Sequence, residues 1–397
     1  PQPCPRRTFA LGFRRCPGLV YHATPLKSNL SSHHKTSRIT NFCRPDMLFS
    51  EYQYFEYQFP LPQYLGSKYL LRSWLQQFIP RDIRVVCDAF AGSQSMAFLF
   101  KQLGFKVITN DFLNFNHQIG LALIANQNNT LDKQDWESLL QANPDPSYYN
   151  LIESTYTDIF FTRDQCQVID AIRGNIDRLG NKYKRALALA ILNRSLTRKV
   201  TMGHFAHQQA LNYALDPKRI KRNRSLIRPV QEIMADLLPQ YNRAVFANGQ
   251  ENCSYNLDAL ELLPQLQDVD LLYLDPPYCN SHADYQSFYH LLETNSMYWK
   301  DKEFVNGNRR YSPKRYSGFD KKGEALTSLQ KLFALSAAVP HWLISYNDRS
   351  YPDIQTLCEM ISVHRPFRVE RKEYLNSRGG RGSVAGCHEV AIIASQD

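Results

Sequence analysis

Residues 269–278 read Val-Asp-Leu-Leu-Tyr-Leu-Asp-Pro-Pro-Tyr, an apolar run that stops in the tetrad Asp275-Pro276-Pro277-Tyr278. The run has the length and apolar content of a buried parallel strand, and it must end there because prolines donate no backbone hydrogen bond. An acid and an aromatic ring are therefore left at the carboxyl end of a strand. Ligands bind at that edge of open α/β sheets. We interpret the tetrad as part of a binding site rather than as a proline-rich turn.

The tetrad is suited to methylation of an exocyclic amine by a methyl sulfonium. Asp275 can accept one hydrogen bond from adenine N6 and the carbonyl of Pro276 another, since proline keeps its acceptor. Both contacts strengthen as the nitrogen gains positive charge, so they stabilise the transition state more than the ground state. Tyr278 offers a flat face to the purine, and such stacking contributes about 1–3 kcal/mol per base. This chemistry needs no metal.

Upstream of the tetrad, the pattern predicts a strand, a turn, a helix and a second strand. Residues 83–88 are strand-like and lead into the turn that holds Gly92, and residues 106–109 form the next strand before Asp111. A glycine at such a turn lets a ligand approach the backbone, and an acid after the second strand usually holds ribose hydroxyls. Gln94 stands where another glycine would be expected, so a nucleoside cofactor without pyrophosphate fits better than NAD. A purely structural turn is the alternative.

The loop Tyr64-Leu65-Gly66-Ser67-Lys68 precedes apolar residues at helical spacing between residues 70 and 79. We expect a tight loop that opens an amphipathic helix. Such a loop can place backbone donors and a lysine around a carboxylate or a phosphate. Packing alone also explains it.

The remaining pattern predicts an α/β fold with an insertion. Residues 114–242 are helical and polar, and the sheet is expected to resume at residues 244–246 and to continue with the tetrad strand, residues 341–348 and a hairpin of residues 368–374 and 388–394. We predict a Rossmann-like sheet with helices on both faces. The expected division is a catalytic domain of residues 47–118 and 244–397 and a mainly helical insertion of residues 119–243.

The net charge of +10 is concentrated at the start of the chain. Residues 1–46 hold +7 of it, which leaves only +3 for the rest, so overall charge is weak evidence for a nucleic-acid partner. Local basic clusters are better evidence. A single cluster is usually a solvated face, but three in a nearly neutral body favour a surface that follows a phosphate backbone. These clusters contain Arg198 and Lys199, then Lys218, Arg219, Lys221, Arg222 and Arg224, then Arg309 and Arg310.

Composition also indicates the cellular setting. The nine cysteines include no Cys-x-x-Cys pair, which fits reduced thiols in the cytoplasm. The histidines show no metal-ligand spacing. No run of eighteen apolar residues is present, so we predict no membrane span. Residues 1–46 are acid-poor and broken by prolines, and we expect a disordered tail before Met47 rather than an organelle-targeting segment.

Taken together, residues 60–396 resemble the alpha-class, Dam-like DNA adenine methyltransferases. Residues 64–68 are similar to that family's first cofactor motif, residues 88–93 to its glycine motif, Asp111 to its ribose-binding acid and residues 275–278 to its catalytic tetrad. Asp258 is similar to the acid before the catalytic strand, and residues 345–348 to the strand motif that follows. The order of the motifs, with an insertion before the tetrad, is that of the alpha class.

The resemblance implies S-adenosylmethionine as methyl donor, no metal, and an adenine flipped out of double-stranded DNA as acceptor. A cognate restriction endonuclease encoded separately is a further possible partner. The implied cofactor residues are Tyr64, Lys68, Asp88, Phe90, Gly92, Asp111, Asp258 and Asp275, and the implied catalytic residues are Asp275, Pro276, Pro277 and Tyr278. Two alternatives stay open: an RNA adenine-N6 methyltransferase that uses the same tetrad, and a catalytically silent DNA-binding relative.

Overall fold

A computed structural model of the chain describes residues 57–279, 284–373 and 388–396, and all structural statements below concern these residues. The expected tail, Met47 and residues 374–387, which connect the two strands of the expected hairpin, lie outside the described residues. Within the described part, no helix combines the length and the apolar character that a membrane span requires.

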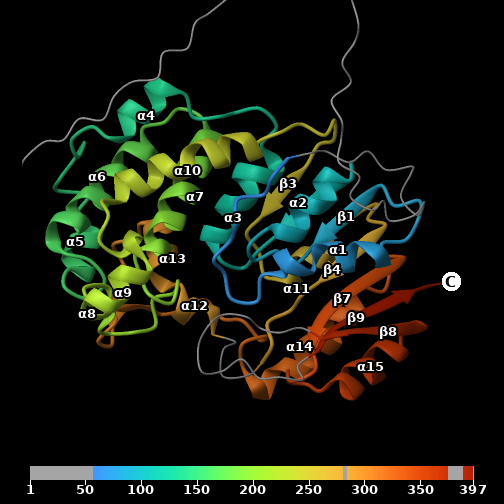
Figure 1. The fold of residues 1–397 in the computed structure, drawn as a ribbon. Helices are drawn as coiled ribbons and strands as arrows, with labels where there is room; N and C mark the ends of the chain where they lie inside the picture. The colour runs from blue at the N-terminus through green and yellow to red at the C-terminus, as the bar shows by residue number, and fades with distance from the viewer. Residues whose placement is uncertain (1–56, 280–283, 374–387, 397) are drawn as a thin grey trace, which may run out of the picture. The chain divides into compact units, whose positions relative to one another are not determined.

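A seven-stranded sheet in the order β3-β2-β1-β4-β7-β9-β8 forms the centre of the fold (Figure 1). The strands β3 (Cys253–Tyr255), β2 (Lys106–Asn110), β1 (Val85–Asp88), β4 (Leu271–Leu274) and β7 (His341–Asn347) are parallel, while β9 (His388–Ser395) pairs antiparallel with both β7 and β8 (Phe367–Glu373). All four residues of β4 are buried, as its apolar run requires. The α/β fold class expected from the sequence is confirmed.

Strand register brings the motifs together. Asp88 pairs with Tyr273 on one side and with Thr109 on the other, so β1, β2 and β4 end at the same level of the sheet. The loops that begin at Ala89, Asp111 and Asp275 therefore leave one edge side by side. This edge is where the sequence places its glycine, its ribose acid and its tetrad.

Helices cover both faces of the sheet, and alternate residues of each strand face opposite sides. Val86, Val107 and Leu271 belong to the hydrophobic core on the side of α2 (Ser95–Gln102) and α3 (Asn114–Gly120). Leu272 and Trp342 belong to a second core, together with α11 (Ala259–Leu262), α14 (Lys322–Leu335) and α15 (Ile354–Ser362). The sheet is thus buried on both faces.

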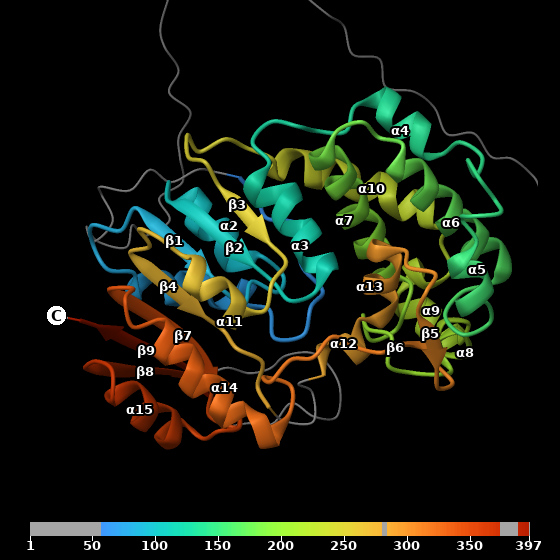
Figure 2. The same ribbon diagram turned by 180° about the vertical axis from the view of Figure 1, so that it is seen from behind.

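A cluster of helices lies beside the sheet on the side of α3 (Figure 2). It is built around α7 (Lys182–Arg198), which packs against α3, α6 (Arg163–Asp177), α10 (Val230–Ala244) and α13 (His290–Met297). The cluster also contains α4 (Lys133–Leu139), α5 (Leu151–Tyr156), α8 (Ala210–Ala214) and α9 (Pro217–Arg222). Because α13 follows the tetrad in sequence, this cluster is not made of residues 119–243 alone. The short α12 (Tyr285–Phe288) and the hairpin of β5 (Glu303–Val305) and β6 (Arg310–Ser312) adjoin α13.

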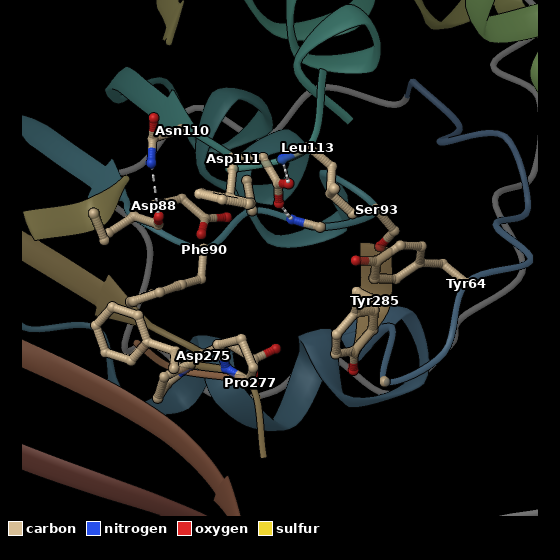
Figure 3. Close-up of a pocket in the computed structure, with 18 of the residues that line it drawn as sticks. Tyr64, Asp88, Phe90, Ser93, Asn110, Asp111, Leu113, Asp275, Pro277 and Tyr285 are labelled. Carbon is tan, nitrogen blue, oxygen red and sulfur yellow. Dashed lines mark hydrogen bonds between the residues drawn. The ribbon is translucent and has the colours of Figure 1, made fainter. Parts of the chain in front are cut away.

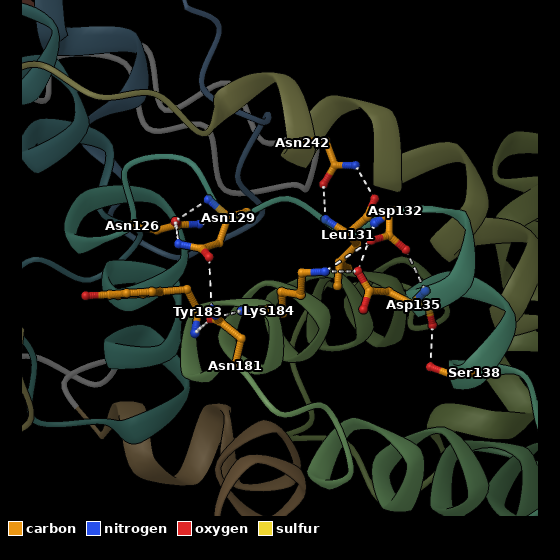
Figure 4. A network of polar contacts seen from close by, with 10 residues as sticks. All are labelled: Asn126, Asn129, Leu131, Asp132, Asp135, Ser138, Asn181, Tyr183, Lys184 and Asn242. Atoms are coloured by element: carbon orange, nitrogen blue, oxygen red, sulfur yellow. Dashed lines mark hydrogen bonds and ion pairs between the residues drawn. The ribbon is translucent and has the colours of Figure 1, made fainter.

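Polar side chains fix the outer helices of this cluster (Figure 4). Lys184 on α7 forms ion pairs with Asp135 at 2.6 Å and Asp132 at 3.2 Å, both at the start of α4. Asn242 on α10 donates to the carbonyl of Leu131 at 2.8 Å and accepts from its N–H at 3.1 Å. These contacts hold the connection between α3 and α4 against α7 and α10.

Two local expectations are wrong. Residues 244–246 are not a strand, because Ala244 ends α10 and Phe246 turns inward to stack with Tyr57 at a centroid distance of 4.2 Å. The strand is β3, nine residues further along at Cys253–Tyr255. The single helix expected between residues 70 and 79 is divided into η1 (Lys68–Leu71), α1 (Arg72–Leu75) and η2 (Gln76–Phe78).

Candidate active site

A cavity lies at the carboxyl ends of β1, β2 and β4 (Figure 3). It encloses about 960 Å³ of space, part of which opens to solvent. The structure brings together in its wall every cofactor and catalytic residue expected from the sequence, although these residues come from separate segments of the chain. They are Tyr64, Lys68, Asp88, Phe90, Gly92, Asp111, Asp258, Asp275, Pro276, Pro277 and Tyr278.

Asp275 is held by a buried ion pair. The ammonium group of Lys68 donates to both carboxylate oxygens, at 2.9 and 2.8 Å, and to the carbonyl of Gly66 at 3.0 Å. The hydroxyl of Tyr278 donates to the same carboxylate at 3.1 Å. Burial raises the pKa of Asp275 above its ordinary value, and the charge of Lys68 opposes that rise. Lys68 thus favours the ionised carboxylate in a site that otherwise disfavours charge.

Tyr278 is oriented by contacts on two sides. Its ring meets the ring of Tyr346 on β7 edge to face, at a centroid distance of 5.2 Å. The ammonium group of Lys68 lies 5.0 Å from the centre of the Tyr278 ring. The strand motif at residues 345–348 thus supports the tetrad through Tyr346, which the sequence alone did not indicate.

Asp88 is a buried acid that lacks a partner. Its side chain is fully buried, and among the described residues neither of its carboxylate oxygens finds a hydrogen-bond donor. Burial raises the pKa of Asp88 well above its ordinary value, and the nearby Asp275 and Asp111 raise it further. The backbone N–H groups of Phe90 and Ala97 lie near the carboxylate and oppose the rise, without forming a well-aligned hydrogen bond to it. An unsatisfied buried acid is costly. Because Asp88 lines the cavity, a bound cation or hydrogen-bond donor would satisfy it.

Asp111 is held by three donors. One of its oxygens accepts from the backbone N–H of Gly92 at 2.7 Å, and the other accepts from Leu113 N–H at 2.8 Å and from the amide of Asn116 at 3.1 Å. Gly92 has a φ of +48°, which favours glycine, and a Cβ there would lie 3.0 Å from a ring carbon of Tyr64. Gly92 therefore permits both the turn and the approach of Tyr64 to it.

Three tyrosine rings stack at the side of the cavity. The ring of Tyr64 is nearly parallel to those of Tyr285 and Tyr289, with centroid distances of 5.6 and 5.0 Å and interplanar angles of 18° and 12°, and the centroids of Tyr285 and Tyr289 are 6.4 Å apart. The hydroxyl of Tyr289 accepts from Leu65 N–H at 2.9 Å, which ties the loop of residues 64–68 to α13. Neither Tyr285 nor Tyr289 was expected at the site from the sequence. Their i, i+4 spacing was the available signal.

Asp258 is the N-cap residue of α11. It caps α11 by accepting from Leu260 N–H at 2.9 Å, and Glu261 completes a capping box. Its side chain also borders the cavity. Among the described residues, no three His, Cys, Asp or Glu side chains are grouped as metal ligands.

The basic residues differ in how far they are exposed to solvent. Arg309 is exposed, while Arg198 and Arg310 are half-buried. Lys199 is 1% exposed, and its ammonium group donates to the carbonyls of Leu226 and Arg228. Burial lowers the pKa of Lys199 to about 8. It is therefore a buried structural contact, and its expected place on a DNA-binding surface is wrong. The residues of the second cluster are all exposed on and after α9: Lys218, Arg219, Lys221, Arg222 and Arg224.

Sequence comparisons agree with this geometry. Residues 64–346 match the family described as D12 class N6 adenine-specific DNA methyltransferase. The Type II methyltransferase M2.HphI of Haemophilus parahaemolyticus is 33% identical over 311 residues, which cover 77% of this chain and 88% of that protein. M.NlaIII of Neisseria lactamica is 25% identical, with 78% and 91% covered. M.FokI of Planomicrobium okeanokoites is 24% identical, with 84% of this chain and 53% of that protein covered.

Proposed function

Because the chain belongs to the D12 class of N6 adenine-specific DNA methyltransferases, we propose that it uses S-adenosylmethionine to methylate N6 of an adenine flipped out of double-stranded DNA. One observation carries the proposal. The tetrad acid Asp275 shares one cavity with Asp88 and Asp111, so an acceptor base and a nucleoside donor can meet there. The named Type II relatives support a specific recognition sequence and a cognate restriction endonuclease encoded separately.

The donor supplies a methyl group on a sulfonium, whose C–S bond breaks as the N6–C bond forms. Asp275 and the carbonyl of Pro276 accept hydrogen bonds from the two N6–H groups and so orient the nitrogen lone pair. As N6 becomes cationic, these acceptors stabilise the charge, and the excess proton then leaves N6 for Asp275 or water. Tyr278 stacks on the purine. A carboxylate has about four acceptor sites, so Asp275 can bind N6–H while it keeps its contacts with Lys68 and Tyr278.

The wall of the cavity offers matching groups for the donor. Asp111 would accept hydrogen bonds from the ribose hydroxyls. Asp88, whose carboxylate oxygens have no hydrogen-bond partner among the described residues, would form an ion pair with the ammonium group of the methionine part. Gly92 lets the ligand approach the backbone, and Phe90, Tyr64 and Asp258 complete the wall. We assign Lys68 primarily to Asp275, on the evidence of its two short contacts.

We further propose that exposed and half-buried basic residues contact DNA phosphates, which position the duplex without reading its sequence. These are Arg198, Lys218, Arg219, Lys221, Arg222, Arg224, Arg309 and Arg310.

The decisive variant is Asp275→Ala. We expect it to lower the rate of methyl transfer from labelled S-adenosylmethionine to unmethylated duplex DNA by at least about 10²-fold, the scale of removing one preorganised electrostatic group. Thermal unfolding of the variant controls for a loss of fold. Retained transfer would contradict the catalytic assignment.

Two measurements separate the alternatives. When structured RNA competes with duplex DNA, we expect the RNA to accept few methyl groups. Preferential methylation of the RNA would instead indicate an RNA methyltransferase. Calorimetric titration of S-adenosylmethionine should show binding, and its absence would indicate a silent relative.

A further inference from the structure

Glu293 is a buried acid on α13 that lies outside the residues assigned so far. Its side chain is 2% exposed. One carboxylate oxygen accepts from Asn114 N–H at 2.9 Å, and the other accepts from Phe115 N–H at 3.0 Å. These are backbone donors at the start of α3, where a helix has no partners of its own for its first N–H groups. Glu293 therefore caps α3 from a different helix.

The segment that Glu293 holds is the one that follows Asp111. Asp111 accepts from Leu113 N–H and from Asn116, and both residues flank the pair capped by Glu293. Residues 111–116 are thus fixed by two carboxylates, one from the end of β2 and one from α13. A shift at the start of α3 would move Asp111 relative to Gly92 and the cavity.

We propose that Glu293 is a positioning residue for the methyl donor, because its ionised carboxylate holds the start of α3 and thereby sets the place of Asp111. This inference rests on the proposed use of S-adenosylmethionine. It adds that donor affinity depends on the charge state of a group that lies behind the cavity wall.

Protonation of Glu293 would weaken this arrangement. A protonated carboxyl turns one acceptor into a donor, which would then face a backbone N–H. Burial raises the pKa of Glu293 to about 7, Asp111 raises it further, and the two backbone donors and Arg315 oppose the rise. Tyr311 on β6 also interacts electrostatically with Glu293. The ionised form is therefore dominant above about pH 7 and is lost below it.

The test is calorimetric titration of S-adenosylmethionine into the wild-type protein and Glu293→Gln at several pH values from 6 to 8.5. If only the ionised form is competent, the dissociation constant of the wild type should rise about tenfold from pH 8 to pH 6. Glu293→Gln should bind at pH 8 at least as weakly as the wild type at pH 6, with little change across the range.

Asp170→Asn is the matched control. Asp170 on α6 is 1% exposed and caps α5 in the same manner, accepting from Ile152 N–H at 3.0 Å and Glu153 N–H at 2.9 Å. It does not line the cavity. Both variants should lower the midpoint of thermal unfolding, but Asp170→Asn should keep the wild-type donor affinity and pH profile.

Two results would overturn the inference: a wild-type affinity that does not change with pH, or a Glu293→Gln profile that matches the wild type. If Glu293→Gln does not fold, Glu293→Asp replaces it, and an unchanged midpoint of the pH profile would then count against the inference. Absence of methyl transfer by the wild type at pH 8 would instead contradict the proposed function. Transfer with a flat binding profile would contradict only the role of Glu293.

Discussion

Lys68 and Asp275 form an ion pair that influences the pKa of Asp275, the proposed catalytic carboxylate. Burial of Asp275 raises its pKa, and Lys68 is the first of the groups that lower it. The pair is exposed by only 4% at Lys68 and 17% at Asp275, so solvent screens the interaction little. Removal of one partner from such a pair leaves an uncompensated charge.

We therefore expect Lys68→Met to raise the pKa of Asp275 further and to shift the acid limb of the pH–rate profile towards higher pH. The loss of rate should be largest at the acid end of the profile, because a smaller fraction of Asp275 is ionised there. Steady-state methylation rates between pH 6 and 9.5 measure the shift. Lys68→Arg retains the charge and should recover part of the activity. An unchanged acid limb in Lys68→Met would show that Lys68 does not control Asp275.

At the scale of single residues, the sequence identified the groups that directly follow strands. Asp88, Asp111 and Asp275 could be found because each comes at the end of a buried apolar run, where a parallel sheet places ligands. Glu293 and Tyr285 reach the same region through helix packing. No local pattern in the sequence specifies such contacts, and Lys199 shows the converse, because a basic cluster does not reveal which member turns inward.

At the scale of elements, the helix after Asp111 is fixed at both ends by buried ionisable side chains. Glu293 caps the start of α3, and α3 continues into η3 (Leu121–Ala125), a stretch of π-helix. At its far end, Lys101 on α2 donates to the carbonyls of Leu123 at 2.9 Å and Asn126 at 2.8 Å. Lys101 is fully buried, and burial lowers its pKa to about 7.

The stabilising effect of Lys101 should grow with pH. Between about pH 7 and 10.5 the unfolded chain keeps Lys101 protonated while the folded state does not, so the free energy of unfolding rises with pH relative to Lys101→Met. The slope can reach about 1.4 kcal/mol per pH unit. Urea unfolding at pH 7.5, 8.5 and 9.5 measures it, and the exposed Lys133→Met is the control. A difference that stays constant with pH would contradict the prediction.

Elements with a clear period were predictable, and short ones were not. Residues 83–88, 106–109 and 341–348 read as strands because their apolar content matches a buried sheet, and β1, β2 and β7 lie there. Residues 244–246 have the same apolar character, but Ala244 is the last residue of α10, and Val245 and Phe246 are buried in the loop that follows it. The strand β3 is short and only partly buried, so its pattern is faint.

At the scale of the whole molecule, α13 joins the helical cluster to the sheet. Its buried Asn295 donates to Asn193 on α7 at 2.8 Å, and Thr294 accepts from Tyr156 on α5 at 3.1 Å. Its other side reaches the cavity wall through Tyr289 and Glu293. If the chain is divided into a catalytic domain and an insertion at residue 243, α13 belongs to the catalytic domain by sequence but packs against α5 and α7 of the insertion.

We expect the exposed cluster on α9 to control the salt dependence of DNA binding. Combined replacement of Lys218, Lys221 and Arg222 by Ala should make the slope of log K against log salt shallower by about 0.9 for each phosphate that the variant no longer neutralises. The slope is measured by fluorescence anisotropy of a labelled DNA duplex at salt concentrations from about 50 to 200 mM. Protein–phosphate interactions weaken strongly over about this range. The buried Lys199→Met should leave it unchanged. Equal slopes for all three proteins would exclude α9 from the DNA surface.

The position of β9 has a consequence for how the molecule is made. Among the strands of the described residues, β9 comes last in sequence, yet it lies inside the sheet, hydrogen-bonded to β7 on one side and β8 on the other. During translation, β7 keeps an open edge until residue 395 has left the ribosome, and such an edge invites pairing with another chain. The sheet of the nascent enzyme is therefore complete only after β9 has been synthesised, although its neighbours β7 and β8 both precede it in the chain.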